Sequence, residues 1–387
     1  MKEKLKILYI EDDINARTKL VNLLQSDIIG NYEIEITGTE DFNIPAQNIR
    51  NYQIIILDIY NGKPGDKGNA FGEEVLTKIQ QAFFVPVIFY SGNIESVQHL
   101  RSQIIGVATK GDGGIEELKS EIERITKHNL PFLKGRVHAY IESVFKKYFW
   151  EVIQKENNKF SPDADDFSLG YMLLRNFADS LSKESIKNIM GDNTISPDKV
   201  HPMEFYIYPT NLTKEYECGE IISKGNDVYV ILTPSCDFVS GNGRKRKVDH
   251  VVLLKTTLLI ESKEYKNYAI SKKELDNFLQ RGNQNKEEIK KKEDTVRKHH
   301  DSLSQFINSG KSDRFFFLPE TPFIQNRVID FQNKVIICYD SLKKEYKRIA
   351  KLDNPFAQSM ATSYARYYNR IGFPDIDSEF VISHLSL

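Results

Sequence analysis

The chain has 387 residues, of which 40% are hydrophobic and 28% charged, and its formal net charge is −1. This length predicts two or three domains, and the composition is that of an ordinary globular protein. The near-zero net charge excludes a chain built mainly to coat nucleic acid, although a local basic patch remains open.

The cysteines and the N-terminus indicate the compartment. Three cysteines without paired spacing indicate a reducing environment rather than a disulfide framework. The N-terminal MKEKLKILYIEDD has no apolar signal-peptide core, and no later stretch is apolar for long enough to span a bilayer. We therefore expect a cytoplasmic protein that makes no contact with a membrane.

Four short apolar runs in the first third of the chain each end in a polar residue where a turn is expected. They are ILYIEDD with Glu11, Asp12 and Asp13, IIILDIY with Asp58, VIFYSG with Ser91, and GVATKG with Lys110. Short apolar runs that alternate with helical patterns predict βα units around a parallel sheet. Polar residues at the carboxyl ends of such strands line one shared crevice.

The residue types in this crevice predict its chemistry. Clustered carboxylates repel one another unless a hard cation lies among them, and Mg²⁺ suits a site with few protein oxygens. A carboxylate held beside Mg²⁺ can attack a phosphoryl group and form an aspartyl-phosphate. The lysine and the hydroxyl would then pair with the phosphoryl oxygens as their charge develops.

The four motifs, in this order, resemble the receiver domain of two-component response regulators over residues 4–127. The resemblance implies an α/β fold: a flavodoxin-like, doubly wound, five-stranded parallel sheet. It implies that Asp58 is the phosphoacceptor for a sensor histidine kinase and that the phosphorylated chain can dephosphorylate itself. By the same resemblance, Ser91 is the switch hydroxyl and Lys110 contacts the phosphate.

The resemblance also implies a set of magnesium ligands. Glu11 and Asp12 form the acidic pair, Asp58 adds its carboxylate, and the backbone carbonyl of Tyr60 is the third protein ligand.

Three features depart from the receiver pattern. Gly111 rather than proline follows the lysine, and Val107 stands where an aromatic switch residue is frequent. The loop NGKPGDKGNAFG that follows the phosphoacceptor motif is long and glycine-rich. It is either a partner-binding lid or a tolerated insertion.

Residues 1–127 are thus the predicted receiver domain, and residues 128–200 are predicted to be a helical connector. The segment KGRVHAYIESVFKKYFWEVIQKEN has apolar residues at helical spacing in a wide stripe. The stripe either packs on the following helices or forms an interface with a second copy, which would make a homodimer. Both alternatives remain open.

Residues 201–387 change character and predict a mixed, mainly β C-terminal domain. β-Branched and aromatic runs broken by Gly, Asn and Pro indicate a small barrel or an antiparallel sheet. A long charged stretch within residues 271–307 predicts a solvated helix or helix pair, and residues 356–372 predict a further amphipathic helix.

Cysteine and histidine residues in this domain are candidates for chemistry. Cys236 lies after an expected strand and would need His201 or His250 as a base, and Cys218, Cys236 and His250 are the residue types of a zinc site. No CxxC pair supports zinc, and turn chemistry accounts for the local pattern, so we expect neither site.

A run of four basic residues lies in an expected hairpin loop. Arg244, Lys245, Arg246 and Lys247 suit either phosphate binding, which leaves nucleic acid open as a partner, or a solvated tip, which we favour.

The strand-end SCD and the ending PFAQSMATSYARYYNRIGFPD resemble C-terminal regions of prokaryotic conflict and phage-defence proteins. The whole chain resembles the receiver component of a defensive two-component system such as Detocs. This implies a role in antiviral defence, with a separate effector protein as a further partner.

We therefore expect a response regulator that accepts a phosphoryl group on Asp58. Its C-terminal domain would be an interaction module and not an enzyme. The alternative is a phosphorylation-gated effector whose C-terminal domain is an enzyme or binds nucleic acid.

Overall fold

The computed structural model describes residues 3–42, 51–59, 76–77, 80–81, 84–127, 129–155, 166–191, 199–241, 243, 245–280, 285–308, 313–369 and 377–384. The chain divides into two compact units, residues 1–197 and 198–387, which we call the N-terminal and C-terminal units. The three-part division of the sequence stays a prediction. Within the described ranges, no helix combines the length and the apolar character that crossing a membrane requires.

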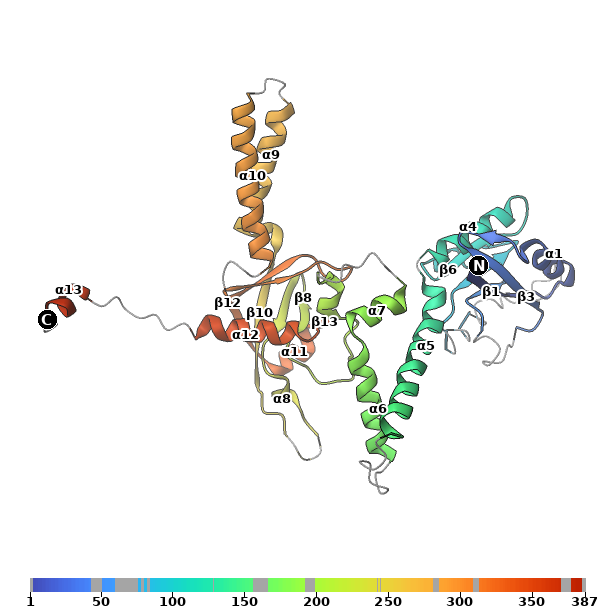
Figure 1. The fold of residues 1–387 in the computed structure, drawn as a ribbon, viewed down its shortest axis with the longest axis horizontal. Coiled ribbons are helices and arrows are strands. Elements are labelled where there is room, and N and C mark those ends of the chain that lie inside the picture. The colour runs from blue at the N-terminus through green and yellow to red at the C-terminus, as the bar shows by residue number, and fades with distance from the viewer. Residues whose placement is uncertain are drawn as a thin grey trace. The chain divides into compact units, whose positions relative to one another are not determined.

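A six-stranded sheet forms the centre of the N-terminal unit (Figure 1). In spatial order its strands are β2 (Ile28–Ile29), β3 (Tyr32–Thr39), β1 (Glu3–Ile10), β4 (Ile54–Leu57), β5 (Val87–Ser91) and β6 (Ile105–Thr109). All neighbouring strands are parallel except β2, which pairs antiparallel with β3. Every residue of β4 and β5 is buried, as expected for parallel strands covered on both faces.

Five strands of this sheet, β3, β1, β4, β5 and β6, are parallel, and the short antiparallel strand β2 is a sixth that was not predicted. Gly30, with φ of 58°, begins a two-residue turn that brings Ile29 opposite Tyr32. A glycine adopts this left-handed conformation without steric cost, so a tight antiparallel hairpin forms at the edge of the sheet.

Two helices cover one face of this sheet. In α1 (Ile14–Leu24) and α4 (Gly114–Thr126), Leu24, Leu118 and Ile122 are fully buried against the strands. Each such side chain stabilises the fold by about 1.5–3 kcal/mol. These helices therefore shield one face of the sheet from water.

Three more helices follow in the N-terminal unit. They are α5 (Leu130–Tyr148), which continues as a π-helical turn (Phe149–Ile153), α6 (Asp166–Ser180) and α7 (Lys183–Met190). Phe132 stacks on Tyr32 of β3 with ring centroids 4.7 Å apart, which anchors the start of α5. Tyr140 of α5 donates a hydrogen bond to the carbonyl of Ser180 at 2.6 Å. The predicted apolar stripe packs partly on the following helices, because the ring of Phe145 lies 5.8 Å from that of Phe177 of α6, while Trp150 remains 52% exposed.

A seven-stranded antiparallel sheet forms the C-terminal unit, so of the two predicted forms the sheet is observed. In spatial order its strands are β11 (Phe315–Leu318), β12 (Arg327–Cys338), β10 (His250–Leu258), β9 (Asp227–Ile231), β8 (Glu220–Lys224), β13 (Lys347–Leu352) and β7 (Tyr206–Ile207). Gly225, with φ of 58°, forms the two-residue turn between β8 and β9.

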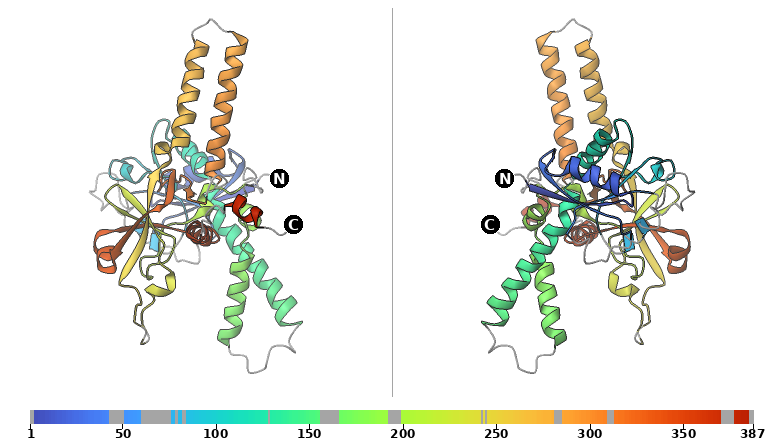
Figure 2. Two further views of the ribbon diagram at one scale, coloured as in Figure 1. Left: turned by 90° about the vertical axis from the view of Figure 1, so that its left-hand side faces the viewer. Right: turned by 90° about the vertical axis from the view of Figure 1, so that its right-hand side faces the viewer.

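Helices of two kinds accompany this sheet. The short helices are α8 (Ser235–Phe238), α11 (Tyr339–Glu345), α12 (Phe356–Tyr368) and α13 (Ser378–Ser383). The predicted helix pair is α9 (Lys263–Gln280) and α10 (Lys286–Ile307), which run side by side away from the sheet (Figures 1 and 2). Leu303 and Phe306 pack at the base of this pair.

Candidate functional site

The carboxyl ends of the parallel strands bring the predicted polar residues to one edge of the sheet. The strand pairing extends one residue past the strands. The amide of Asp58 donates to the carbonyl of Ile10 at 3.0 Å, and the amide of Lys110 donates to the carbonyl of Ser91 at 2.9 Å. Because β5 lies between β4 and β6, Ser91 lies between the strands that carry Asp58 and Lys110. Ser91 is buried, with 2% of its surface exposed.

Three carboxylates meet at this edge. Glu11, Asp12 and Asp58 each place an oxygen within 4.8 Å of the others. Glu11 is 1% exposed and Asp58 is 7% exposed, so their charges have little water to screen them. A set of carboxylate oxygens of this kind fits Mg²⁺ or another hard divalent cation. Tyr60, predicted to add its carbonyl, lies outside the described residues.

Lys110 joins two of these carboxylates. Its Nζ donates to Oε2 of Glu11 and, at 3.0 Å, to Oδ2 of Asp58. Burial alone would lower the pKa of Lys110, but the charges and hydrogen bonds of Asp58 and Glu11 outweigh burial and raise it. Lys110 therefore stays protonated and balances the negative charge of the two carboxylates.

The backbone of the acidic turn is held by a residue that the sequence did not single out. Arg17 of α1 donates from Nη1 to the carbonyls of Glu11 at 2.5 Å and Asp12 at 3.3 Å. Its stem crosses β3 at Gly38, where an added Cβ would lie only 2.7 Å from Cγ of Arg17. Asp13 begins α1 by accepting from the amide of Asn15 at 2.7 Å.

A second residue that sequence reasoning missed is Tyr9. Its hydroxyl donates to Oε2 of Glu11 at 2.5 Å. The signal was present in the sequence, because residues two apart on a strand face the same side of the sheet.

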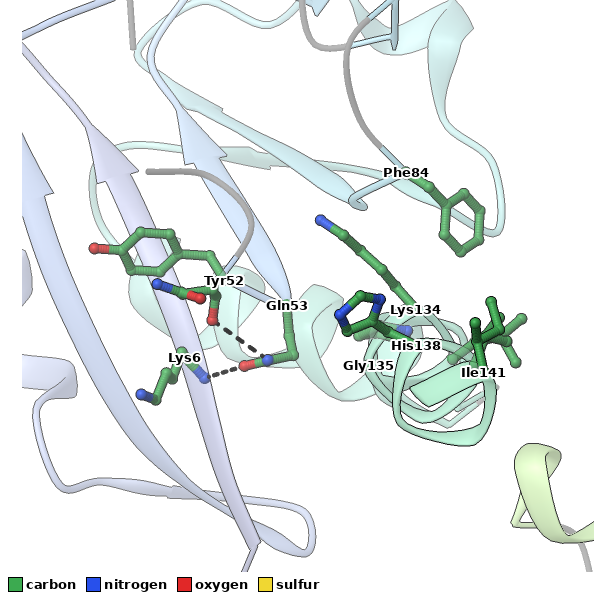
Figure 3. Close-up of a pocket in the computed structure, with 12 residues that line it drawn as sticks. Lys6, Tyr52, Gln53, Phe84, Lys134, Gly135, His138 and Ile141 are labelled. Carbon is green, nitrogen blue, oxygen red and sulfur yellow. Dashed lines mark hydrogen bonds between the residues drawn. The ribbon is translucent and has the colours of Figure 1, made fainter. Parts of the chain in front are cut away.

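A groove of about 900 Å³ lies near the amino-terminal ends of β4 and β5, at the other end of the strands from the candidate metal site (Figure 3). Lys6, Gln53 and Phe84 line it from the side of the sheet, and His138 and Ile141 line it from α5. Its lining contains no carboxylate among the described residues. This groove is therefore separate from the candidate metal site.

The structure describes the surroundings of Cys218, Cys236 and His250 in the C-terminal unit. Cys236 is exposed, and the thiol of Cys218 donates to the carbonyl of Leu232 at 3.5 Å. Burial raises the pKa of Cys218, which disfavours the thiolate. His250 of β10 lies opposite Cys338 of β12. In the described part of this unit, no three His, Cys, Asp or Glu ligand atoms come within 4.8 Å of one another.

The basic loop is partly engaged in packing. The guanidinium of Arg246 lies 3.7 Å from the ring centre of Tyr339, and its Nε donates to the carbonyl of Val248 at 2.7 Å. Arg244 lies outside the described residues, and Lys245 and Lys247 remain the candidates for phosphate contact.

A polar cluster connects β9, β10 and β12. Lys255 forms an ion pair with Asp227 at 2.9 Å, and Nη1 of Arg327 donates to the hydroxyl of Thr256 at 3.1 Å. Arg327 is only 9% exposed. Burial lowers its pKa, while the negative charges of Glu261 and Asp227 oppose that shift. The side chains of Lys255 and Asp227 are 34% and 50% exposed, so Arg327 is the buried cation of this cluster. Cations beside carboxylates are residue types that phosphoryl and phosphodiester chemistry uses.

Comparison with known proteins bears on the C-terminal unit. A family model described as NERD, a nuclease-related domain, matches residues 212–329. This segment runs from before β8 to the first residues of β12 and contains the polar cluster. None of the curated proteins matches the chain in sequence.

A solved structure resembles the N-terminal third of the chain. It is described as the crystal structure of a two component transcriptional regulator AraC from Clostridium phytofermentans ISDg. It is 21% identical, covers 33% of this chain and 98% of that chain, and has a TM-score of 0.24. At that TM-score, the likeness carries no argument about this chain.

The match to a nuclease-related domain overturns the expectation that the chain is not an enzyme. That expectation depended on the lack of a cysteine nucleophile with its base and on the lack of a zinc motif. Hydrolysis of a phosphodiester needs neither, because carboxylates that hold a divalent cation can activate water. The match therefore points to an enzymatic domain in the C-terminal unit rather than to a pure interaction module.

Proposed function

We propose that this chain is a phosphorylation-gated response regulator in which Asp58 accepts a phosphoryl group and a nuclease-like C-terminal unit is the output. The observation that carries the proposal is the arrangement around Lys110, whose amine contacts Glu11 and Asp58 beside Asp12. The nuclease-related match supports the nature of the output.

The chemistry at Asp58 follows from its neighbours. A carboxylate oxygen of Asp58 attacks the phosphorus of a phosphohistidine on a partner kinase, and the P–N bond to the imidazole breaks as the O–P bond forms. Lys110 balances the charge that reaches the phosphoryl oxygens, and the hydroxyl of Ser91 donates to one of them. Mg²⁺, held by Glu11, Asp12 and Asp58 with the carbonyl of Tyr60, would neutralise the phosphoryl oxygens during transfer.

The output is proposed to act on a phosphodiester bond of nucleic acid. The polar cluster of Asp227, Lys255 and Arg327 is the candidate reaction site, because it joins carboxylate and cation within the nuclease-related segment. Three cysteines without paired spacing fit a reducing compartment, so the cytoplasm is the proposed location. A role in antiviral defence follows from the resemblance of the C-terminal sequence and is tested by phage infection of cells that carry the gene.

Two linked assays test the proposal. Intact mass is measured after incubation with acetyl phosphate and Mg²⁺, for the natural chain and for Asp58→Asn. We expect a gain of one phosphate that the variant lacks. Absence of the gain, in a chain shown to be folded and also given its own kinase, would refute the phosphoacceptor role.

The second assay measures cleavage of plasmid DNA and of RNA with and without the phosphoryl donor. We expect cleavage to change with phosphorylation, to lose that dependence in Asp58→Asn, and to disappear in Asp227→Asn. Asp294→Asn is the matched control, because Asp294 pairs with Arg297 on the exposed face of α10. Full cleavage by Asp227→Asn would remove the polar cluster from the mechanism.

A further inference from the structure

Tyr9 places a hydroxyl in the core of the N-terminal unit, next to the candidate metal site. It lies two residues before Glu11 near the end of β1, and its side chain is 0% exposed. Its ring packs in the apolar cluster that α1 and α4 cover. A phenylalanine would fill that space equally well, so the hydroxyl calls for a separate reason.

The hydroxyl has one hydrogen-bond partner among the described residues, which is Oε2 of Glu11 at 2.5 Å. Burial of a hydroxyl without a partner is unfavourable, so this bond compensates the loss of water. A hydrogen bond to a charged carboxylate is also stronger than one between neutral groups.

The two oxygens of Glu11 have different surroundings. Oε2 accepts from both Tyr9 and Lys110, whereas Oε1 accepts from the amide of Asp13 at the longer distance of 3.3 Å. The carboxylate is therefore held through Oε2, which leaves Oε1 as the oxygen with the weaker protein contact.

The two donors to Oε2 differ in what they must do during phosphoryl transfer. Lys110 also contacts Asp58 and moves its charge toward the phosphoryl oxygens once they arrive. Tyr9 is buried on a strand and has no competing partner among the described residues. When Lys110 turns to the phosphoryl group, Tyr9 is the donor that remains on Glu11.

We infer that Tyr9 is a positioning residue for the metal site, because its hydroxyl fixes the carboxylate of Glu11. Glu11, Asp12 and Asp58 would then form a preorganised cation site both before and after Asp58 is phosphorylated. This inference rests on the proposed magnesium-dependent function. Partners that orient a ligand in this way typically change metal affinity by about 10–100-fold when they are removed.

The test is a double-mutant cycle on the dissociation constant of Mg²⁺, measured by calorimetric titration of the full chain. The variants are Tyr9→Phe, Glu11→Gln and the two together. We expect Tyr9→Phe to weaken binding by about 10–100-fold in the natural background and by less than about 2-fold in the Glu11→Gln background. A merely structural role would give the same loss in both backgrounds, and that result overturns the inference.

Tyr90→Phe is the matched control, since it also removes one hydroxyl from a buried tyrosine whose ring lies 6.5 Å from that of Tyr9. We expect its Mg²⁺ affinity to equal that of the natural chain. A loss equal to that of Tyr9→Phe would overturn the inference.

The result separates the inference from the proposed function. If the natural chain binds no Mg²⁺, the proposed function fails and the inference fails with it. If the natural chain binds Mg²⁺ and Tyr9→Phe binds it equally well, only the inference fails.

A spectroscopic measurement covers the case in which Tyr9→Phe does not fold. With 3-fluorotyrosine at position 9 of the full chain, we expect the ¹⁹F resonance to shift on titration with Mg²⁺ along the same curve as the calorimetric binding. A resonance that does not move while Mg²⁺ binds would overturn the inference.

Discussion

Replacement of Lys110 by methionine tests the electrostatics of the candidate site most directly. The change removes the amine that contacts the carboxylates of Glu11 and Asp58 and retains much of the apolar stem. The two carboxylates are 1% and 7% exposed, so they remain buried and repel each other without a counter-charge. Removal of one partner from a buried ion pair costs about 3–5 kcal/mol.

This magnitude gives a measurable change in the melting temperature. For a unit of this size, each kcal/mol corresponds to about 2–4 °C, so the N-terminal unit is expected to melt roughly 6–20 °C lower in EDTA. A divalent cation among the carboxylates replaces the lost positive charge, so saturating Mg²⁺ should remove most of the deficit. Differential scanning calorimetry of the full chain with EDTA and with Mg²⁺ measures both effects.

The control is Lys119→Met. Lys119 pairs with Asp27 at 2.8 Å, but about a third of each side chain is exposed. A pair of this kind contributes less than about 1 kcal/mol, and Mg²⁺ should not change the effect of its loss. A Lys110→Met deficit that is absent in EDTA, or that is the same with Mg²⁺, would refute the reasoning.

The pH dependence adds a second check. Burial raises the pKa of Glu11 despite the hydrogen bonds from Lys110 and Tyr9. A carboxyl with a raised folded pKa contributes stability that is present below its unfolded pKa, about 4.3, and is lost as pH rises through the folded pKa. The Lys110→Met deficit should therefore be largest at neutral pH and shrink on acidification.

Two further predictions concern other charged groups. Burial alone would raise the pKa of Glu121, but hydrogen bonds from Arg124 and Arg101 outweigh burial and lower it. The stability that Glu121 contributes is therefore present above its unfolded pKa of about 4.3 and is lost as pH falls through the folded pKa. Glu121→Gln should therefore cost about 2 kcal/mol in urea unfolding at pH 7 and converge on the natural chain below pH 4, whereas an equal deficit at both pH values would contradict this. If the basic loop contacts phosphates, Lys245→Gln with Lys247→Gln should make the plot of log affinity for DNA against log salt shallower by about 1.8, and an unchanged slope would exclude the loop from the interface.

Much of the N-terminal unit was predictable from the sequence because its signals are local. Strand-like runs that end in Glu11, Asp58, Ser91 and Lys110 mark the strand ends, and parallel strands share one carboxyl edge. The sixth strand was not predicted, because Ile28–Ile29 is too short to show any period and depends on the turn at Gly30.

The C-terminal unit shows where prediction from sequence failed. Its antiparallel strands and its helix pair follow from composition and periodicity, but several strands, such as β8 with β13 and β10 with β12, pair over long separations in the chain. Register across such strands decides which polar residues meet: it places His250 opposite Cys338 rather than beside Cys236. The expectation that this unit is not an enzyme failed because it considered only a cysteine nucleophile and a zinc motif, whereas the match over residues 212–329 is to a nuclease-related domain.

The sequence by itself determined which residue types stand at the strand ends, and these carboxylates and this lysine suffice to predict a magnesium-dependent phosphoryl acceptor. Only the tertiary structure decided how those groups are held. Arg17 reaches the acidic turn because α1 packs across Gly38, and the hydroxyl of Tyr9 meets Glu11 because the end of β1 is buried. The contact of Arg17 depends on the distance between two packed elements, which no local pattern of residues encodes. The spacing of Tyr9 and Glu11 indicates only that the two side chains share one side of the strand, and not that they meet.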